Sequence, residues 1–120
     1  MVISLKYIIA VIRPEKLDAV KKKLPEVEVN GLTVSSISGY GSQRGYLEFD
    51  RNKAQNYEAH LLEMIKLEIA VNDFRLQMTN DAIKRGAKDE EGYVGSGKIF
   101  ILPLEDAIRI RTNENRYDAI

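Results

Sequence analysis

The strongest structural signal in this sequence is an alternation of apolar and other residues at positions 65–71. Apolar side chains stand at every second position from Ile65 to Val71, separated by Lys66, Glu68 and Ala70. A period of two residues is typical of a half-buried strand, because successive side chains in a strand point to opposite faces. The chain is therefore limited to folds that contain a sheet with one buried face.

Three other segments have the composition of strands. They are rich in apolar or β-branched residues and cover residues 7–12, 32–41 and 98–104. Helical patterns occupy residues 14–24 and 72–86. The resulting order is strand, helix, strand, strand, helix, strand. This order predicts the α+β class and the ferredoxin-like split βαβ (βαββαβ) fold.

Both predicted helices have recognisable ends. The first begins at Pro14 and ends before Pro25, because proline fits a first helical turn but interrupts a helix interior. For the second helix, Asn72 is the predicted N-cap and Gly86 the predicted C-cap. Its apolar stripe is predicted to consist of Phe74, Met78 and Ala82.

Length and composition exclude several classes of protein. With 120 residues the chain is expected to form one domain, residues 1–120. Its 18 basic and 18 acidic side chains cancel, so nothing in the charge indicates a nucleic-acid partner. The chain has no cysteine and one histidine, His60, which leaves little for a metal cage or a catalytic dyad. No membrane span or signal peptide is apparent, and a soluble cytoplasmic protein is expected.

Residues 41–60 are polar and have no helix or strand period. About twenty such residues inside a compact domain are unusual, and loops of this length tend to be functional or disordered. This loop is the most informative irregularity of the sequence.

The segment from Gly92 to Lys98 fits the first seven positions of a P-loop, G-x-x-x-x-G-K. A true P-loop continues with Ser or Thr, which binds magnesium, and leads into a helix. Here Ile99 stands at the eighth position and a strand pattern follows. The P-loop interpretation is therefore rejected.

The same glycines still suit a different phosphate site. Arg109 and Arg111 alternate on a short segment that is predicted to be extended, so both can point the same way. Backbone N–H groups of Gly95 and Gly97, with Lys98 and the two arginines, would form a compact polyphosphate site. The alternatives are a plain turn before a strand and a solvated pair of arginines.

Four motifs resemble the PII signal-transduction protein family. They are "VIRPEKLDAV" near the start, "GYGSQRG" at 39–45, "GYVGSGKIF" at 92–100 and "AIRIRTNE" at 107–114. The resemblance implies a homotrimer that binds ATP or ADP in the clefts between subunits. By matching positions, it implies that the nucleotide contacts Thr33, Gly39, Gly41, Gln43, Gly95, Gly97, Lys98, Arg109 and Arg111.

In this family the long loop, called the T-loop, changes shape with the nucleotide and docks onto a target protein. In this sequence it covers approximately residues 42–60. The residues expected to contact a partner are Tyr46, Phe49, Arg51 and Tyr57. Tyr57 is either a docking aromatic or a modified tyrosine. The target is not identified by the sequence, and a membrane transporter is one candidate.

One position departs from the family pattern. Typical members bind 2-oxoglutarate through a magnesium ion held by the glutamine that matches Gln43, and a lysine pairs with the far carboxylate. Met64 stands at the place of that lysine. A thioether cannot neutralise a buried carboxylate, so a weak or absent response to 2-oxoglutarate is expected.

The sequence therefore predicts a nucleotide-sensing regulator of nitrogen metabolism that is not an enzyme, with ATP, ADP and additionally Mg as ligands. Two alternatives remain open. One is a slow ATPase, for which no positioned base is evident. The other is a trimeric metal-handling or structural protein of ferredoxin-like fold, which would leave the paired arginines without a purpose.

Overall fold

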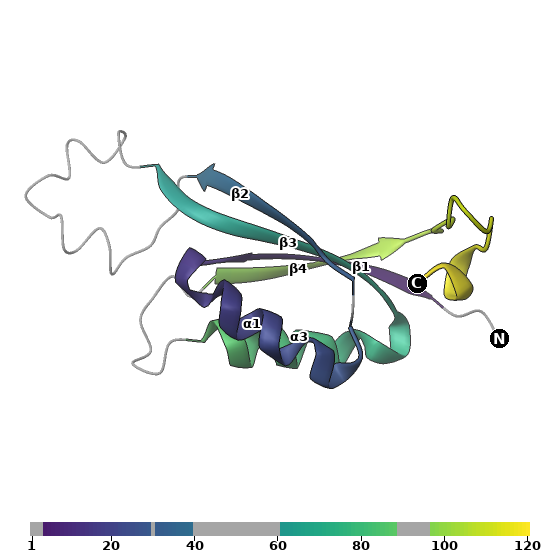
Figure 1. The fold of residues 1–120 in the computed structure, drawn as a ribbon, viewed down its shortest axis with the longest axis horizontal. Helices are drawn as coiled ribbons and strands as arrows, with labels where there is room; N and C mark the ends of the chain where they lie inside the picture. Colours follow the sequence, from purple (N-terminus) through teal and green to yellow (C-terminus); the bar gives the residue numbers. More distant parts are fainter. Residues whose placement is uncertain (1–3, 30, 40–60, 89–96) are drawn as a thin grey trace, which may run out of the picture.

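The computed structural model describes residues 4–29, 31–39, 61–88 and 97–120. These residues form a four-stranded antiparallel sheet with the strand order β2-β3-β1-β4. Figure 1 shows that helices α1 and α3 cover the same face of this sheet, and that the chain reaches its C-terminus at the end of the sheet where β1 begins. The predicted α+β class and ferredoxin-like split βαβ order are confirmed.

The elements have the following bounds: β1 Leu5–Ile12, α1 Leu17–Lys23, β2 Thr33–Gly39, β3 Leu62–Asn72, α3 Leu76–Ala87 and β4 Gly97–Leu104. Short 3-10 turns precede both helices, at Pro14–Lys16 and Asp73–Arg75. A further 3-10 turn, η5, covers Arg116–Ala119.

Strand β1 lies in the middle of the sheet and pairs along its full length with β3 and β4. Leu5 is opposite Asn72 and Leu104, and Ile12 is opposite Ile65 and Gly97. Because paired residues share a face, this register determines which side chains meet the helices. We call the face opposite the helices the open face.

The hydrophobic core lies between the sheet and the two helices. Ile8 and Ala10 of β1 and Leu67 of β3 are completely buried there. The helices contribute Val20 and Ile83, among others. On the first helix, Val20 and Leu24 are buried and Leu17 packs against the core.

The helices approach each other closely at Gly86. A Cβ atom at this position would lie 2.7 Å from the Cα of Val20, so only glycine fits without a shift of the backbone. The prediction that Gly86 caps α3 is therefore wrong. The residue lies inside the helix, which continues to Ala87, and it serves the contact with α1.

The other details predicted for α3 also differ. Asn72 precedes a 3-10 turn, and its side chain makes no capping hydrogen bond. Phe74 and Met78 are 56% and 41% exposed, so they are not part of the core stripe. The buried stripe consists of Thr79, Ala82, Ile83, Gly86 and Ala87.

Strand β4 is an edge of the sheet and is less buried than the other apolar strands. Phe100, Ile101 and Leu102 are each between 41% and 49% exposed.

None of the helices in the described ranges has the length and apolar composition of a membrane-spanning segment.

Candidate functional site

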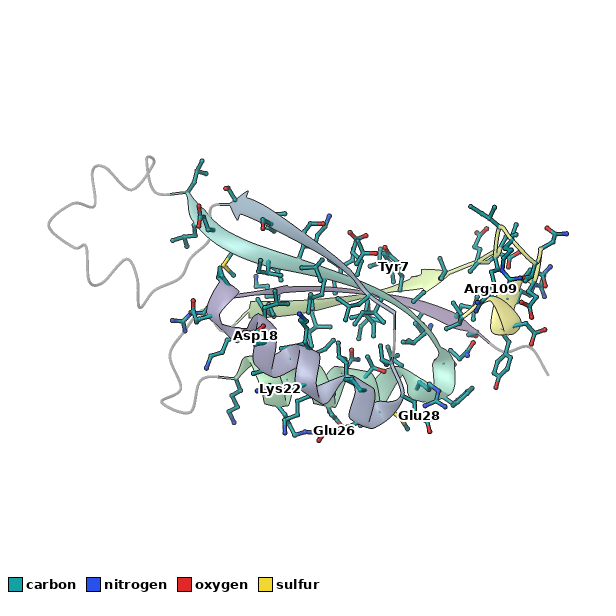
Figure 2. The ribbon with its side chains drawn as sticks, in the orientation of Figure 1. Tyr7, Asp18, Lys22, Glu26, Glu28 and Arg109 are labelled. Carbon is teal, nitrogen blue, oxygen red and sulfur yellow. The ribbon has the colours of Figure 1, made fainter. Side chains whose placement is uncertain are left out.

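A cavity of about 790 Å³ lies beside the open face, near the start of β2. Its walls come from segments far apart in the sequence: Tyr7 on β1, Thr33 on β2, Glu68 on β3 and Arg109 after β4. Figure 2 shows Tyr7 above the middle of the sheet and Arg109 in the C-terminal segment that follows β4. Arg75 and Glu28, which form an ion pair, also line the cavity. The cavity therefore combines two arginines, two glutamates and two hydroxyl groups.

Glu68 is held in place by two neighbours on the open face. The hydroxyl of Tyr7 donates a hydrogen bond of 2.5 Å to Glu68 Oε2. The ammonium of Lys66, two residues earlier on the same strand, lies 3.6 Å from Glu68 Oε1. Thr33 is directly opposite Glu68 in the β2–β3 pairing. The carboxylate is thus fixed between two strands next to the cavity.

The same contacts shift the ionisation of both partners. The hydrogen bond from Tyr7 lowers the pKa of Glu68 below its ordinary value, because a donor stabilises the carboxylate. The hydrogen bond to Glu68 raises the pKa of Tyr7, and partial burial adds to this rise. At neutral pH the tyrosine is therefore the donor and the glutamate the charged acceptor.

Arg109 lies at the start of a tight turn after β4. Its backbone N–H donates to the carbonyl of Glu114 at 2.8 Å, and its carbonyl accepts from the N–H of Asn113 at 2.7 Å. A single bridge between Ile108 and Asn115 closes this turn. The guanidinium contacts the carboxylate of Glu114 at 3.7 Å.

The sequence pattern predicted that Arg111 lies beside Arg109 on an extended segment, and this prediction is wrong. Arg111 belongs to the turn at residues 110–112 and is exposed. Of the two arginines, Arg109 lines the cavity. The alternation was misread because a tight turn and a short extended segment have no distinct pattern over four residues.

Gly97 and Lys98 lie at the other end of β4. Gly97 has a φ of 123°, and a Cβ atom there would lie 2.1 Å from the carbonyl oxygen of Val11. A glycine is thus required for the chain to enter the sheet. Lys98 pairs with Val11 and is exposed. Gly39, the last residue of β2, also lies toward this end, opposite Leu62.

The compact site predicted from Gly97, Lys98 and Arg109 therefore does not exist within one chain. Strand β4 separates the lysine from the arginine by roughly 20 Å, given about 3.3 Å per residue. One group of predicted residues, Thr33 and Arg109, lies at the cavity. The other group, Gly39, Gly97 and Lys98, lies at the opposite end of the sheet.

Several predicted site residues lie outside the described residues. These are the nucleotide-site residues Gly41, Gln43 and Gly95, and the T-loop residues Tyr46, Phe49, Arg51 and Tyr57. For the part of the chain that is described, no group of three or more His, Asp or Glu side chains could hold a metal ion.

Sequence reasoning assigned no role to Tyr7 or Glu68. A signal for Glu68 was present, since it is a charged residue in the middle of a strongly alternating strand. The contact of Tyr7 could not be predicted from local sequence, because its partner Glu68 is 61 positions away in the chain.

Comparison with known proteins gives a consistent result. The family model described as "Nitrogen regulatory protein P-II" matches residues 5–114. The chain belongs to this family. It is 63% identical over 118 residues to the nitrogen regulatory protein GlnK1 of Methanosarcina mazei, covering 98% of this chain and 99% of that protein.

More distant relatives agree. The identity to the nitrogen regulatory protein P-II of Bradyrhizobium diazoefficiens is 43% over 116 residues, which cover 97% of this chain and all of the relative. The crystal structure of Arabidopsis thaliana PII bound to citrate superimposes with a TM-score of 0.79 at 29% identity, covering 98% of this chain and 92% of the other.

Proteins of the P-II family are regulatory signal-transduction proteins rather than enzymes, and this chain is one of them. Its connection to nitrogen regulation follows from the same relationship. Adenine nucleotides are general ligands of the family. The resemblance seen in the four sequence motifs is therefore confirmed.

Proposed function

We propose that this P-II protein is a cytoplasmic sensor of ATP and ADP that acts as a homotrimer and reports the bound nucleotide to a target protein. The nucleotide is held in each cleft between neighbouring subunits. The T-loop, approximately residues 42–60, carries the report and contacts the target through Tyr46, Phe49, Arg51 and Tyr57. No chemical step is needed, because a nucleotide that binds one loop state more tightly shifts the loop population.

The observation that carries this proposal is the separation of the two groups of site residues. Thr33 and Arg109 lie at the cavity, and Gly97 and Lys98 lie at the far end of β4. A head-to-tail contact between copies places different surface patches of two subunits against each other. One subunit then supplies the lysine side of the site and its neighbour supplies the arginine side.

Exposed apolar side chains on β4 also support self-association. Among the described residues, strand β4 pairs with β1 alone, and it carries large exposed apolar side chains, among them Phe100 and Leu102. An exposed edge with apolar residues favours contact with another chain. A domain of 120 residues also gains from covering such surface with a second copy.

The residues fit a phosphate-bearing ligand. Arg109 is a fixed cation at the cavity wall, and Thr33 adds a hydroxyl group. On the neighbouring subunit, Lys98 supplies a further cation. The remaining contacts are assigned to Gly39, Gly41, Gln43, Gly95, Gly97 and Arg111, with Gln43 as the ligand of a magnesium ion that accompanies ATP.

Isothermal titration with ATP and ADP tests the site. Arg109→Ala and Lys98→Ala are each expected to weaken binding at least roughly tenfold, because a charge-assisted contact contributes about 1.5–3 kcal/mol. Lys22→Ala is the matched control, since Lys22 is an exposed lysine on α1 outside the cavity. Affinities equal to that of the unmodified protein in both site variants would place the ligand elsewhere.

Mixing the two site variants tests the position between subunits. In mixed trimers, an Arg109→Ala chain still supplies Lys98, and its Lys98→Ala neighbour still supplies Arg109. Random mixing in equal amounts is expected to restore about a quarter of the clefts to full affinity, because the contact is head-to-tail. No restoration after the subunits have exchanged would assign the site to a single chain.

The response to 2-oxoglutarate depends on Met64 in this proposal. Met64 is 8% exposed and is opposite Ile37 on the open face. Nucleotide binding is expected to be unaffected by 2-oxoglutarate, and Met64→Lys is expected to introduce a response by supplying the missing cation. Titration with ATP, magnesium and 2-oxoglutarate measures both. A strong response in the unmodified protein would contradict the assignment of Met64.

A further inference from the structure

We infer that the C-terminal segment holds Arg109 in an inhibited arrangement and competes with the phosphates of a bound nucleotide. The inhibitory contacts come from Glu114 and from the turn η5. This inference rests on the proposed function, because it concerns regulation of the same site.

The guanidinium of Arg109 is already engaged by this segment. Its Nε lies 3.7 Å from Glu114 Oε1, and its Nη2 donates to the carbonyl of Ala119 at 3.5 Å. The carboxylate of Glu114 is itself positioned, since Thr112 Oγ1 donates to the same Oε1 atom at 2.7 Å. The arginine thus has one anionic and one neutral partner within the described residues.

The turn η5 is attached to the body of the subunit. The rings of Tyr117 and Phe74 are 6.0 Å apart, which joins the turn to the segment before α3. The backbone N–H of Arg116 donates to Asp106 Oδ1 at 3.0 Å and to the carbonyl of Ala107 at 2.9 Å. Ala119 and Ile120 lie in the wall of the cavity that Arg109 and Thr33 also line. The C-terminal residues therefore occupy space beside the proposed phosphate position.

A phosphate group is the stronger partner for a guanidinium, because it bears more charge and accepts two parallel hydrogen bonds. Before it can bind, the contacts of Arg109 to Glu114 and Ala119 must be broken. Both ends of the ion pair are nearly half exposed, at 47% and 48%, so its effect on affinity is modest. The segment lowers nucleotide affinity without abolishing it.

Glu114→Gln provides the direct test, because it removes the charge and keeps the size of the side chain. ATP and ADP are expected to bind about two- to fivefold more tightly, the range for a partly exposed ion pair. Adenosine, which has no phosphate, is expected to bind with unchanged affinity. Tyr117→Ala is expected to act in the same direction, because it releases η5 from Phe74.

Asp118→Asn is the matched control. It removes the same charge from η5 and keeps the ion pair between Glu114 and Arg109. No gain is expected for this variant, and none for Glu114→Gln combined with Arg109→Ala. An equal gain for Asp118→Asn would overturn the inference in favour of a general effect of charge.

Unchanged or weaker ATP binding by Glu114→Gln would also overturn the inference. The proposed function would remain intact in that case if the unmodified protein binds ATP and Arg109→Ala does not. Failure of the unmodified protein to bind ATP or ADP would overturn both.

Discussion

The two faces of the sheet use the same strands for different purposes. On the face covered by α1 and α3, Ile8, Ala10 and Leu67 are fully buried, and all of them are apolar. On the open face, Tyr7 and Glu68 come from the same two strands and are only partly buried. They form a polar contact beside the cavity instead of a core.

This difference shows how a small domain can keep a stable core and a ligand site in adjacent positions of one strand. Successive side chains in a strand point to opposite faces, so a change on one face leaves the other largely unaffected. Along β3, Leu67 and Ile69 belong to the core, and Glu68 between them belongs to the cavity wall.

The core face is expected to contribute most of the stability of the subunit. Leu67→Ala should lower the free energy of unfolding by about 2–5 kcal/mol, since it leaves a cavity at a completely buried position. Leu102→Ala on the open face, where the side chain is 41% exposed, should cost less. Urea denaturation measures both. An equal loss would mean that the assembled protein buries the open face as thoroughly as the core.

A smaller effect is expected where β4 enters the sheet. Gly97→Ala should destabilise the protein by about 1–3 kcal/mol, because a residue with a side chain is strained at φ 123° and meets the carbonyl oxygen of Val11. Gly31→Ala is the control, since a Cβ atom there has no neighbour within 4 Å. If Gly97→Ala and the unmodified protein had equal thermal stability, glycine would not be required at position 97.

The smallest effect is expected for the polar contact of the open face. Tyr7→Phe removes the hydrogen bond to Glu68 and should lower the thermal unfolding temperature slightly at neutral pH. The pKa of Glu68 is lowered from its ordinary value of 4.5, so the stabilisation is lost as the pH falls through the folded-state value.

The pKa of Tyr7 is raised from its ordinary value of 10.0, so the same stabilisation is also lost as the pH rises through the folded-state value above 10.0. The difference between Tyr7→Phe and the unmodified protein should therefore be largest between these limits and disappear at both extremes. Thermal melts across the pH range check this, and a difference independent of pH would show that the lost hydrogen bond is not its cause.

Local patterns predicted the sheet well and the second helix less well. The alternation at 65–71 located β3, and the two prolines located α1, because both patterns depend on neighbouring residues. Gly86 was misassigned as a cap because its actual role depends on Val20, which lies in another helix. Phe74 was placed in the core, whereas it contacts Tyr117 of the C-terminal turn.

The sequence by itself determined the order of strands and helices, the buried face of β3, and the family, because each follows from patterns of residues that are close together in the chain. Only the tertiary structure decided that Lys98 and Arg109 lie at opposite ends of one subunit, and that Glu68 is fixed by Tyr7 beside the cavity. Both results depend on strand pairing between distant segments, and no local pattern encodes which strand ends meet.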